Sequence, residues 1–105
     1  MSGYLFACRV ADLADESAIG VELDGVPICL AKSEGEIFAI SDICSHADIA
    51  LSEGEVGEGT VECWLHGSRF DLRSGQPTGL PANRPVPTYP VKIDGDDVLV
   101  AVKEI

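Results

Sequence analysis

The stretches CSH at residues 44–46 and CWLHGS at residues 63–68 are the part of the sequence around which the chain is organised. They follow the patterns C-x-H and C-x-x-H, and sixteen residues lie between them. Together they contain both histidines and two of the four cysteines of the protein. Thiolates and imidazoles are the ligands that zinc and iron accept in proteins. We therefore interpret the two stretches as loops that supply one metal centre.

Other interpretations of Cys44, His46, Cys63 and His66 remain open at this point. A structural zinc module uses two cysteines and two histidines, but usually as a close Cys pair followed by a close His pair. A Cys44–Cys63 disulfide leaves both histidines unexplained and is not expected in a cytoplasmic chain. A metal-free interaction domain requires that each histidine follow a cysteine by coincidence. The remaining cysteines, Cys8 and Cys29, lie in predicted strands and are expected to be buried free thiols.

Length and composition limit the chain to one domain. Its 105 residues, 46 % of them hydrophobic, suffice for one modest core and leave no room for a separate cofactor domain. The N-terminal residues lack the basic and apolar regions of a signal peptide, and no apolar stretch approaches the roughly 18 residues of a membrane helix. We expect a cytoplasmic protein that does not bind membranes.

The charge is strongly negative and unevenly distributed. Eighteen acidic and seven basic residues give a formal net charge of -11. Between Lys32 and Arg69 there are eight carboxylates and no basic residue. This charge argues against nucleic acid and anionic membranes as partners, and it predicts docking to a basic protein surface.

The pattern of apolar and turn residues predicts an all-β fold, a small antiparallel sandwich or barrel. A hairpin with an Asp-Gly turn is expected over residues 19–32. Glycines at 54, 57 and 59 allow only a brief helical turn at 47–51. Five of the six prolines fall in residues 77–90, which predicts a connector without regular helix. Strands are expected over residues 4–10, 19–23, 26–32, 37–41, 60–62, 68–72, 91–94 and 98–102.

The two stretches resemble the cluster-binding loops of soluble Rieske ferredoxins, where two cysteines hold one iron of a [2Fe-2S] cluster and two histidines hold the other. The segment GLPANRP at residues 79–85 falls where Rieske proteins place a proline loop over the cluster. The resemblance covers nearly the whole chain. It implies a single Rieske domain over residues 1–105, with a base of about residues 1–40 and 86–105 and a cluster-binding subdomain of about residues 41–85.

The resemblance also implies a role for individual residues. Cys44 and Cys63 are expected to bind the inner iron, and His46 and His66 the outer iron. The residues expected around the cluster are Trp64, Gly67, Ser68, Phe70 and Pro81.

Three positions differ from the high-potential Rieske proteins of respiratory complexes. Ile49 and Leu65 stand where those proteins have a pair of disulfide-forming cysteines. Phe70 stands where they have a tyrosine whose hydroxyl contacts a ligand sulfur. With fewer hydrogen-bond donors and a negative surround, we expect a potential toward the low end of the Rieske range of about −150 to +300 mV.

The implied function is electron transfer rather than catalysis. An oxygenase subunit also needs a mononuclear iron, usually with two further histidines, and this chain has none. It also has no G-x-G-x-x-G fingerprint of a nicotinamide or flavin domain. Similarity to the ferredoxin components of aromatic-ring dioxygenases implies a flavin-dependent ferredoxin reductase as donor and a terminal oxygenase as acceptor. Rieske ferredoxins of iron-sulfur cluster assembly and small subunits of nitrite reductases are equally similar, so the acceptor stays open.

Overall fold

The computed structural model describes residues 4–43, 50–63, 69–78 and 85–102, and over these ranges the chain is built from strands and two single-turn 3-10 helices. The predicted all-β class is confirmed. The elements in chain order are β1 (Tyr4–Arg9), η1 (Val10–Asp12), β2 (Ser17–Leu23), β3 (Val26–Ser33), β4 (Glu36–Ser41), η2 (Leu51–Glu53), β5 (Val56–Gly57), β6 (Thr60–Glu62), β7 (Arg69–Asp71), β8 (Thr88–Tyr89), β9 (Val91–Asp94) and β10 (Asp97–Ala101).

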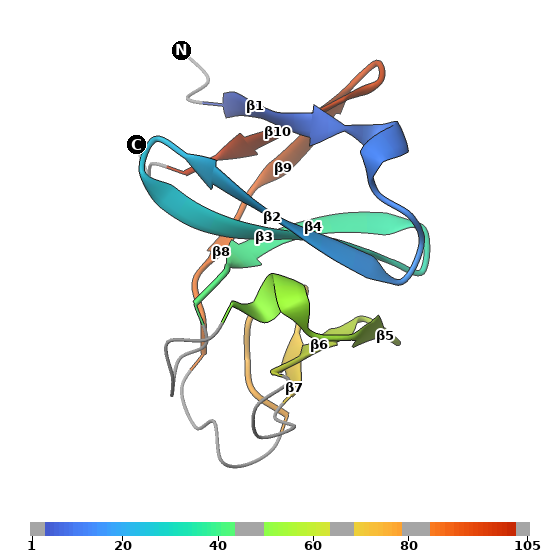
Figure 1. Cartoon of the computed structure of the whole chain (residues 1–105), viewed down its shortest axis with the longest axis vertical. Coiled ribbons are helices and arrows are strands. Elements are labelled where there is room, and N and C mark those ends of the chain that lie inside the picture. Colours follow the sequence, from blue (N-terminus) through green and yellow to red (C-terminus); the bar gives the residue numbers. More distant parts are fainter. Residues whose placement is uncertain (1–3, 44–49, 64–68, 79–84, 103–105) are drawn as a thin grey trace.

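The strands form three antiparallel sheets (Figure 1). A four-stranded sheet of order β2-β3-β4-β8 lies in the middle of the molecule. The three-stranded sheet β1-β10-β9 lies on one side of it and the small sheet β5-β6-β7 on the other. The four-stranded sheet therefore has a neighbour on each side.

Strand β3 is buried on both faces. Successive side chains of a strand point to opposite faces of its sheet. Ile28 and Leu30 belong to the upper core, which they share with residues of β1 and β10. Cys29 and Ala31 belong to the lower core, which they share with residues of η2, β5, β6 and β7. This explains why β3 reads as a continuous apolar run rather than as an alternating pattern.

Three tight turns share one backbone geometry. Both central residues have positive φ, as a type I′ hairpin turn requires, and the second is glycine each time. The sequence predicts the first of the three as a hairpin turn and the second as a turn between two strands. The turns are Asp24-Gly25, Glu34-Gly35 and Glu58-Gly59.

Two strands were not expected from the sequence. β5 has only two residues and pairs with β6 after the glycine-rich segment. β8 lies between Pro87 and Pro90 and pairs only with β4, at the edge of the central sheet, where the missing proline N–H groups do no harm. In the described ranges no helix has the length and apolar character needed to cross a membrane.

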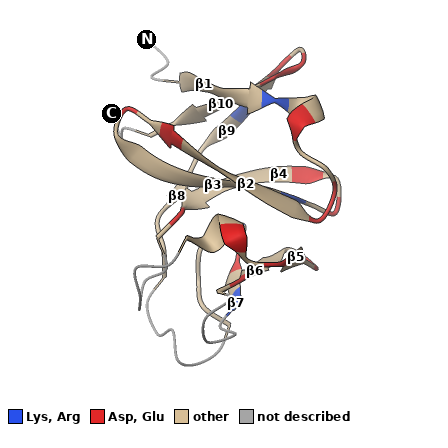
Figure 2. Ribbon diagram, in the orientation of Figure 1, with Lys and Arg blue, Asp and Glu red and all other residues tan. Residues whose placement is uncertain are grey.

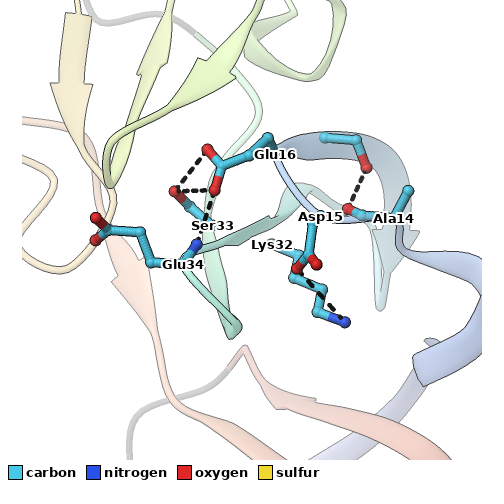
Figure 3. A network of polar contacts seen from close by, with 7 residues as sticks. Ala14, Asp15, Glu16, Lys32, Ser33 and Glu34 are labelled. Atoms are coloured by element: carbon cyan, nitrogen blue, oxygen red, sulfur yellow. Dashed lines mark hydrogen bonds and ion pairs between the residues drawn. The ribbon is translucent and has the colours of Figure 1, made fainter.

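A buried hydroxyl joins the central sheet to the small sheet (Figure 3). Ser33, 1 % exposed at the end of β3, donates to the carboxylate of Glu16 at 3.0 Å and accepts the N–H of Gly59 at 2.9 Å. The backbone N–H of Glu34 donates to the same carboxylate at 2.8 Å. That N–H group is the main reason why the pKa of Glu16 is lowered; desolvation opposes it, and the Ser33 hydroxyl and the N–H of Glu58 add to it.

We expect Glu16→Gln to lower the free energy of unfolding at neutral pH. A carboxyl group whose pKa is lowered in the folded state stabilises the protein above its ordinary pKa of about 4.3, and this contribution disappears as pH falls through the lower folded value. The difference between wild type and Glu16→Gln should therefore be largest near neutral pH and shrink below about pH 4. Denaturant titrations at several pH values measure it.

Glu22→Gln is the matched control, because Glu22 is an exposed carboxylate on β2, the strand that begins directly after Glu16. A difference between Glu16→Gln and wild type that stays constant with pH would contradict the role of the Glu16 charge.

Candidate functional site

Two of the residues assigned to the metal site from the sequence lie in the described ranges. Cys63 directly follows β6, and Phe70 is the middle residue of β7. The other candidates lie outside the described residues: Cys44, His46, Trp64, His66, Gly67, Ser68 and Pro81. Cys63 and Phe70 belong to the same lower core.

Cys63 is a buried free thiol. Its side chain is 0 % exposed, and it is not part of a disulfide. The residues that form this core with it include Leu51 of η2, Val61 of β6 and Phe70 of β7. Phe70 is also 0 % exposed, pairs with Val61 and forms a bridge with Pro77. A cysteine at the end of a strand, inside an apolar layer, can present its sulfur to a metal group without exposing it to water.

The two ends of the segment 44–49 are fastened to each other. Ile43 and Ala50 form an isolated antiparallel bridge. One residue further out on each side, the N–H of Leu51 donates to the carbonyl of Asp42 at 2.7 Å. The chain thus leaves and re-enters the described structure at one place.

Arg69 links the ends of the other two segments. It pairs in register with Glu62, so the segment 64–68 also starts and ends at neighbouring positions. The carbonyl of Arg69 accepts the N–H of Thr78 at 2.8 Å and its hydroxyl at 3.2 Å, just before the segment 79–84. After that segment, the N–H of Val86 donates to the carbonyl of Gly75 at 2.9 Å.

Gly54 brings η2 against β6. A Cβ atom added at Gly54 would collide with the backbone carbonyl of Glu62. The backbone of Gly54 has φ −88°, which any residue adopts, so glycine is needed here for space and not for conformation. This close approach holds η2, which begins at Leu51, against the strand that leads into Cys63, and Leu51 and Cys63 belong to the same core.

The surface of this end of the molecule is acidic. Figure 2 shows acidic positions at η2, on either side of β5 and in β6. Glu53, Glu55 and Glu58 are exposed there. In residues 50–63 and 69–72 the only basic residue is Arg69, whose guanidinium lies 3.8 Å from Glu62 and donates to Thr60 Oγ1 at 2.8 Å. The local charge is therefore strongly negative.

Several residues that shape the site were not assigned from the sequence: Asp42, Ser52, Gly54 and Arg69. Asp42 and Ser52 are ten residues apart and meet only in the folded chain. The predicted burial of Cys8 and Cys29 as free thiols is confirmed. Burial, with a smaller contribution from Asp42, raises the pKa of the Cys29 thiol far above its ordinary value. Cys29 therefore stays a neutral thiol and packs as an apolar residue.

The donor set fits a [2Fe-2S] cluster with divided ligation. Such a cluster takes two cysteines and two histidines, and the two Cys/His stretches of the sequence contain that set. Cys63 satisfies the structural requirement for its part, since it is a free thiol in a dry, apolar layer. Within the described ranges, no group of three or more histidine, cysteine or acidic residues could hold a different metal ion.

Comparison with known proteins finds matches over most of the chain. Residues 3–90 match the model of the Rieske [2Fe-2S] domain family. The ferredoxin component of biphenyl 2,3-dioxygenase from Rhodococcus jostii (strain RHA1) is 46% identical over 93 residues, which cover 89% of this chain and 87% of the relative.

Two solved structures share the fold closely. The ferredoxin of carbazole 1,9a-dioxygenase from Nocardioides aromaticivorans IC177 has a TM-score of 0.90 at 35% identity and covers 95% of this chain and 98% of its own. A chain in a complex of reduced oxygenase and oxidized ferredoxin of carbazole 1,9a-dioxygenase has a TM-score of 0.91 at 25% identity and covers 100% of this chain and 98% of its own.

We expect Gly54→Ala to destabilise the protein by about 2 kcal/mol or more, because the added methyl group meets backbone and not a mobile side chain. Thermal or denaturant unfolding measures the loss. Gly57→Ala is the matched control in the neighbouring strand, where a Cβ would lie 3.7 Å from the Arg69 guanidinium, an ordinary contact. It should change stability by less than about 0.5 kcal/mol. Equal effects of the two variants would contradict the tight contact between η2 and β6.

Proposed function

Since the chain belongs to the Rieske [2Fe-2S] domain family, we propose that its two Cys/His loops and its acidic surface serve one task, the transfer of single electrons between larger proteins. The chain is a ferredoxin component of a dioxygenase system and not an enzyme in its own right. The observation that carries this conclusion is the 46% identity to a dioxygenase ferredoxin component over nearly the full length of both chains. A bound [2Fe-2S] cluster supplies the one-electron chemistry.

We propose Cys44 and Cys63 as ligands of the inner iron and His46 and His66 as ligands of the outer iron. Support comes from Cys63, which is buried and free at the end of β6. Phe70 packs in the same core and has no hydroxyl to donate to a sulfur, which favours a low potential. Trp64, Gly67, Ser68 and Pro81 are proposed to surround the cluster. The cluster-binding part then comprises about residues 41–85, and the rest of the chain is its base.

The proposed electron donor is a flavin-dependent ferredoxin reductase, and the proposed acceptor is a terminal oxygenase. A relative of similar length is found in a complex with an oxygenase. Exposed carboxylates in η2, directly before β5 and in the turn before β6 give the proposed docking surface, so both partners should present basic residues. The charge of -11 also fits a cytoplasmic carrier that avoids nucleic acid and membranes.

The cluster assignment predicts that Cys63→Ser abolishes iron binding, whereas Cys8→Ser does not. Both variants replace a buried free thiol, but Cys8 lies in the upper core. Iron content, the visible spectrum and low-temperature EPR after dithionite measure the outcome. Wild type should be brown with a Rieske-type EPR signal. A colourless protein with stoichiometric zinc and no iron would instead establish the structural zinc module.

The docking surface predicts a salt-dependent rate of electron transfer. Glu53→Gln/Glu55→Gln should slow reduction by the reductase about three- to tenfold at low ionic strength and make the salt dependence shallower. Asp94→Asn/Asp96→Asn removes the same charge from exposed positions in and after β9, on the sheet farther from the small sheet. Stopped-flow kinetics at several salt concentrations measure both pairs. Equal slowing by the two double variants would show that only net charge matters and would contradict this docking surface.

A further inference from the structure

A buried carboxylate closes the base of the segment 44–49. Asp42 lies two positions before Cys44, the first residue of that segment, with Ile43 between them. Asp42 is only 9 % exposed. Its Oδ1 atom accepts the backbone N–H of Ser52 at 2.7 Å, and its Oδ2 atom accepts the Ser52 hydroxyl at 3.0 Å. Both carboxylate oxygens therefore bind Ser52, the middle residue of η2.

The backbone of Asp42 extends the same closure. Its carbonyl accepts the N–H of Leu51 at 2.7 Å, and its N–H donates to the carbonyl of Pro27 at 3.1 Å. The first bond joins the two ends of the segment, and the second ties both to β3 of the central sheet. We call Asp42 and Ser52, with these bonds, the Asp42–Ser52 clamp.

The fold keeps space for the clamp. Gly20 lies on β2, and a Cβ atom added there would come within 2.7 Å of the Ser52 hydroxyl and 3.0 Å of Asp42 Oδ2. A side chain at position 20 would therefore push the two residues apart. Three elements, β2, β3 and η2, thus meet at the clamp.

The clamp closes the loop with hydrogen bonds to a charged acceptor, the Asp42 carboxylate. Hydrogen bonds to a charged acceptor are about twice as strong as neutral ones, and breaking one inside a protein leaves a polar group without its partner. Among the described residues, no ion pair involves Asp42. Among these residues, Ser52 holds the carboxylate by two hydrogen bonds, close to where the segment 44–49 begins.

We propose that Asp42 is a positioning residue for the metal centre. Through Ser52 it fixes where the segment 44–49 begins and ends, and so it holds Cys44 and His46 in place relative to Cys63. This inference rests on the proposed function, because it assigns a task to the clamp only if those residues bind the cluster. It predicts that the clamp controls how firmly the cluster is retained and how uniform its surroundings are.

The test compares cluster retention in variants of the clamp. Asp42→Ala removes both acceptors, and we expect it to release iron to a chelator about tenfold faster than wild type, with a broadened EPR signal. Ser52→Ala removes one bond and should have an intermediate effect. Asp42→Asn keeps one acceptor and gains a donor for the Ser52 hydroxyl, so it should restore release to within about threefold of wild type.

Val98→Ala separates positioning from general stability. Val98 is 0 % exposed in the upper core, and its truncation destabilises the fold without touching the clamp. If Val98→Ala releases iron as fast as Asp42→Ala at matched stability, or if Asp42→Ala leaves the EPR signal and release rate unchanged, the inference is overturned. If Asp42→Ala does not fold, an unchanged release rate in Ser52→Ala overturns it equally.

The outcomes also separate this inference from the proposed function. Wild type without iron and without a Rieske EPR signal would defeat both. Wild type with an intact cluster that is indifferent to Asp42 and Ser52 would defeat only the positioning role.

Discussion

Burial of β3 on both faces is the constraint on which the rest of the structure depends. A chain of 105 residues has too little apolar surface for two independent cores, so one strand must serve two. Ile28 and Leu30 complete the upper core, and Cys29 and Ala31 complete the lower one. The sheet β1-β10-β9 and the small sheet β5-β6-β7 are therefore not separate units, because each is stable only against this common layer.

The proposed metal site is positioned by the lower core and by a few hydrogen bonds next to it. The lower core fixes Cys63 and Phe70, and hydrogen bonds at Asp42, Arg69 and Thr78 fix the points where the three remaining segments leave the structure. A site of this kind is held by the residues behind its ligands as much as by the ligands themselves. A one-electron carrier requires no substrate pocket, and the sequence supplies loops and an acidic surface instead.

The sequence predicted the all-β class and most of the strands, because period-two patterns and Asp-Gly turns are local signals; the donor set, read from the Cys/His spacing, stays a prediction. It did not predict β5 and β8, which have two residues each and exist only because a partner strand is present. Nor did it reveal the Asp42–Ser52 pair or the need for glycine at position 54. Both depend on residues eight to ten positions apart that the fold brings together.

The pairing of β1 with β10 has a consequence for how the chain reaches its structure. β1 hydrogen-bonds to β10 alone in the described sheets, so β1 has no partner strand until β10, about 90 residues later in the chain, has been synthesised. The hairpins β2-β3-β4 need only neighbours in the chain and can form first. Until then Ile28 and Leu30, on the face of β3 that β1 and β10 cover in the folded protein, stay exposed. A nascent chain with this exposed apolar face is a target for chaperones.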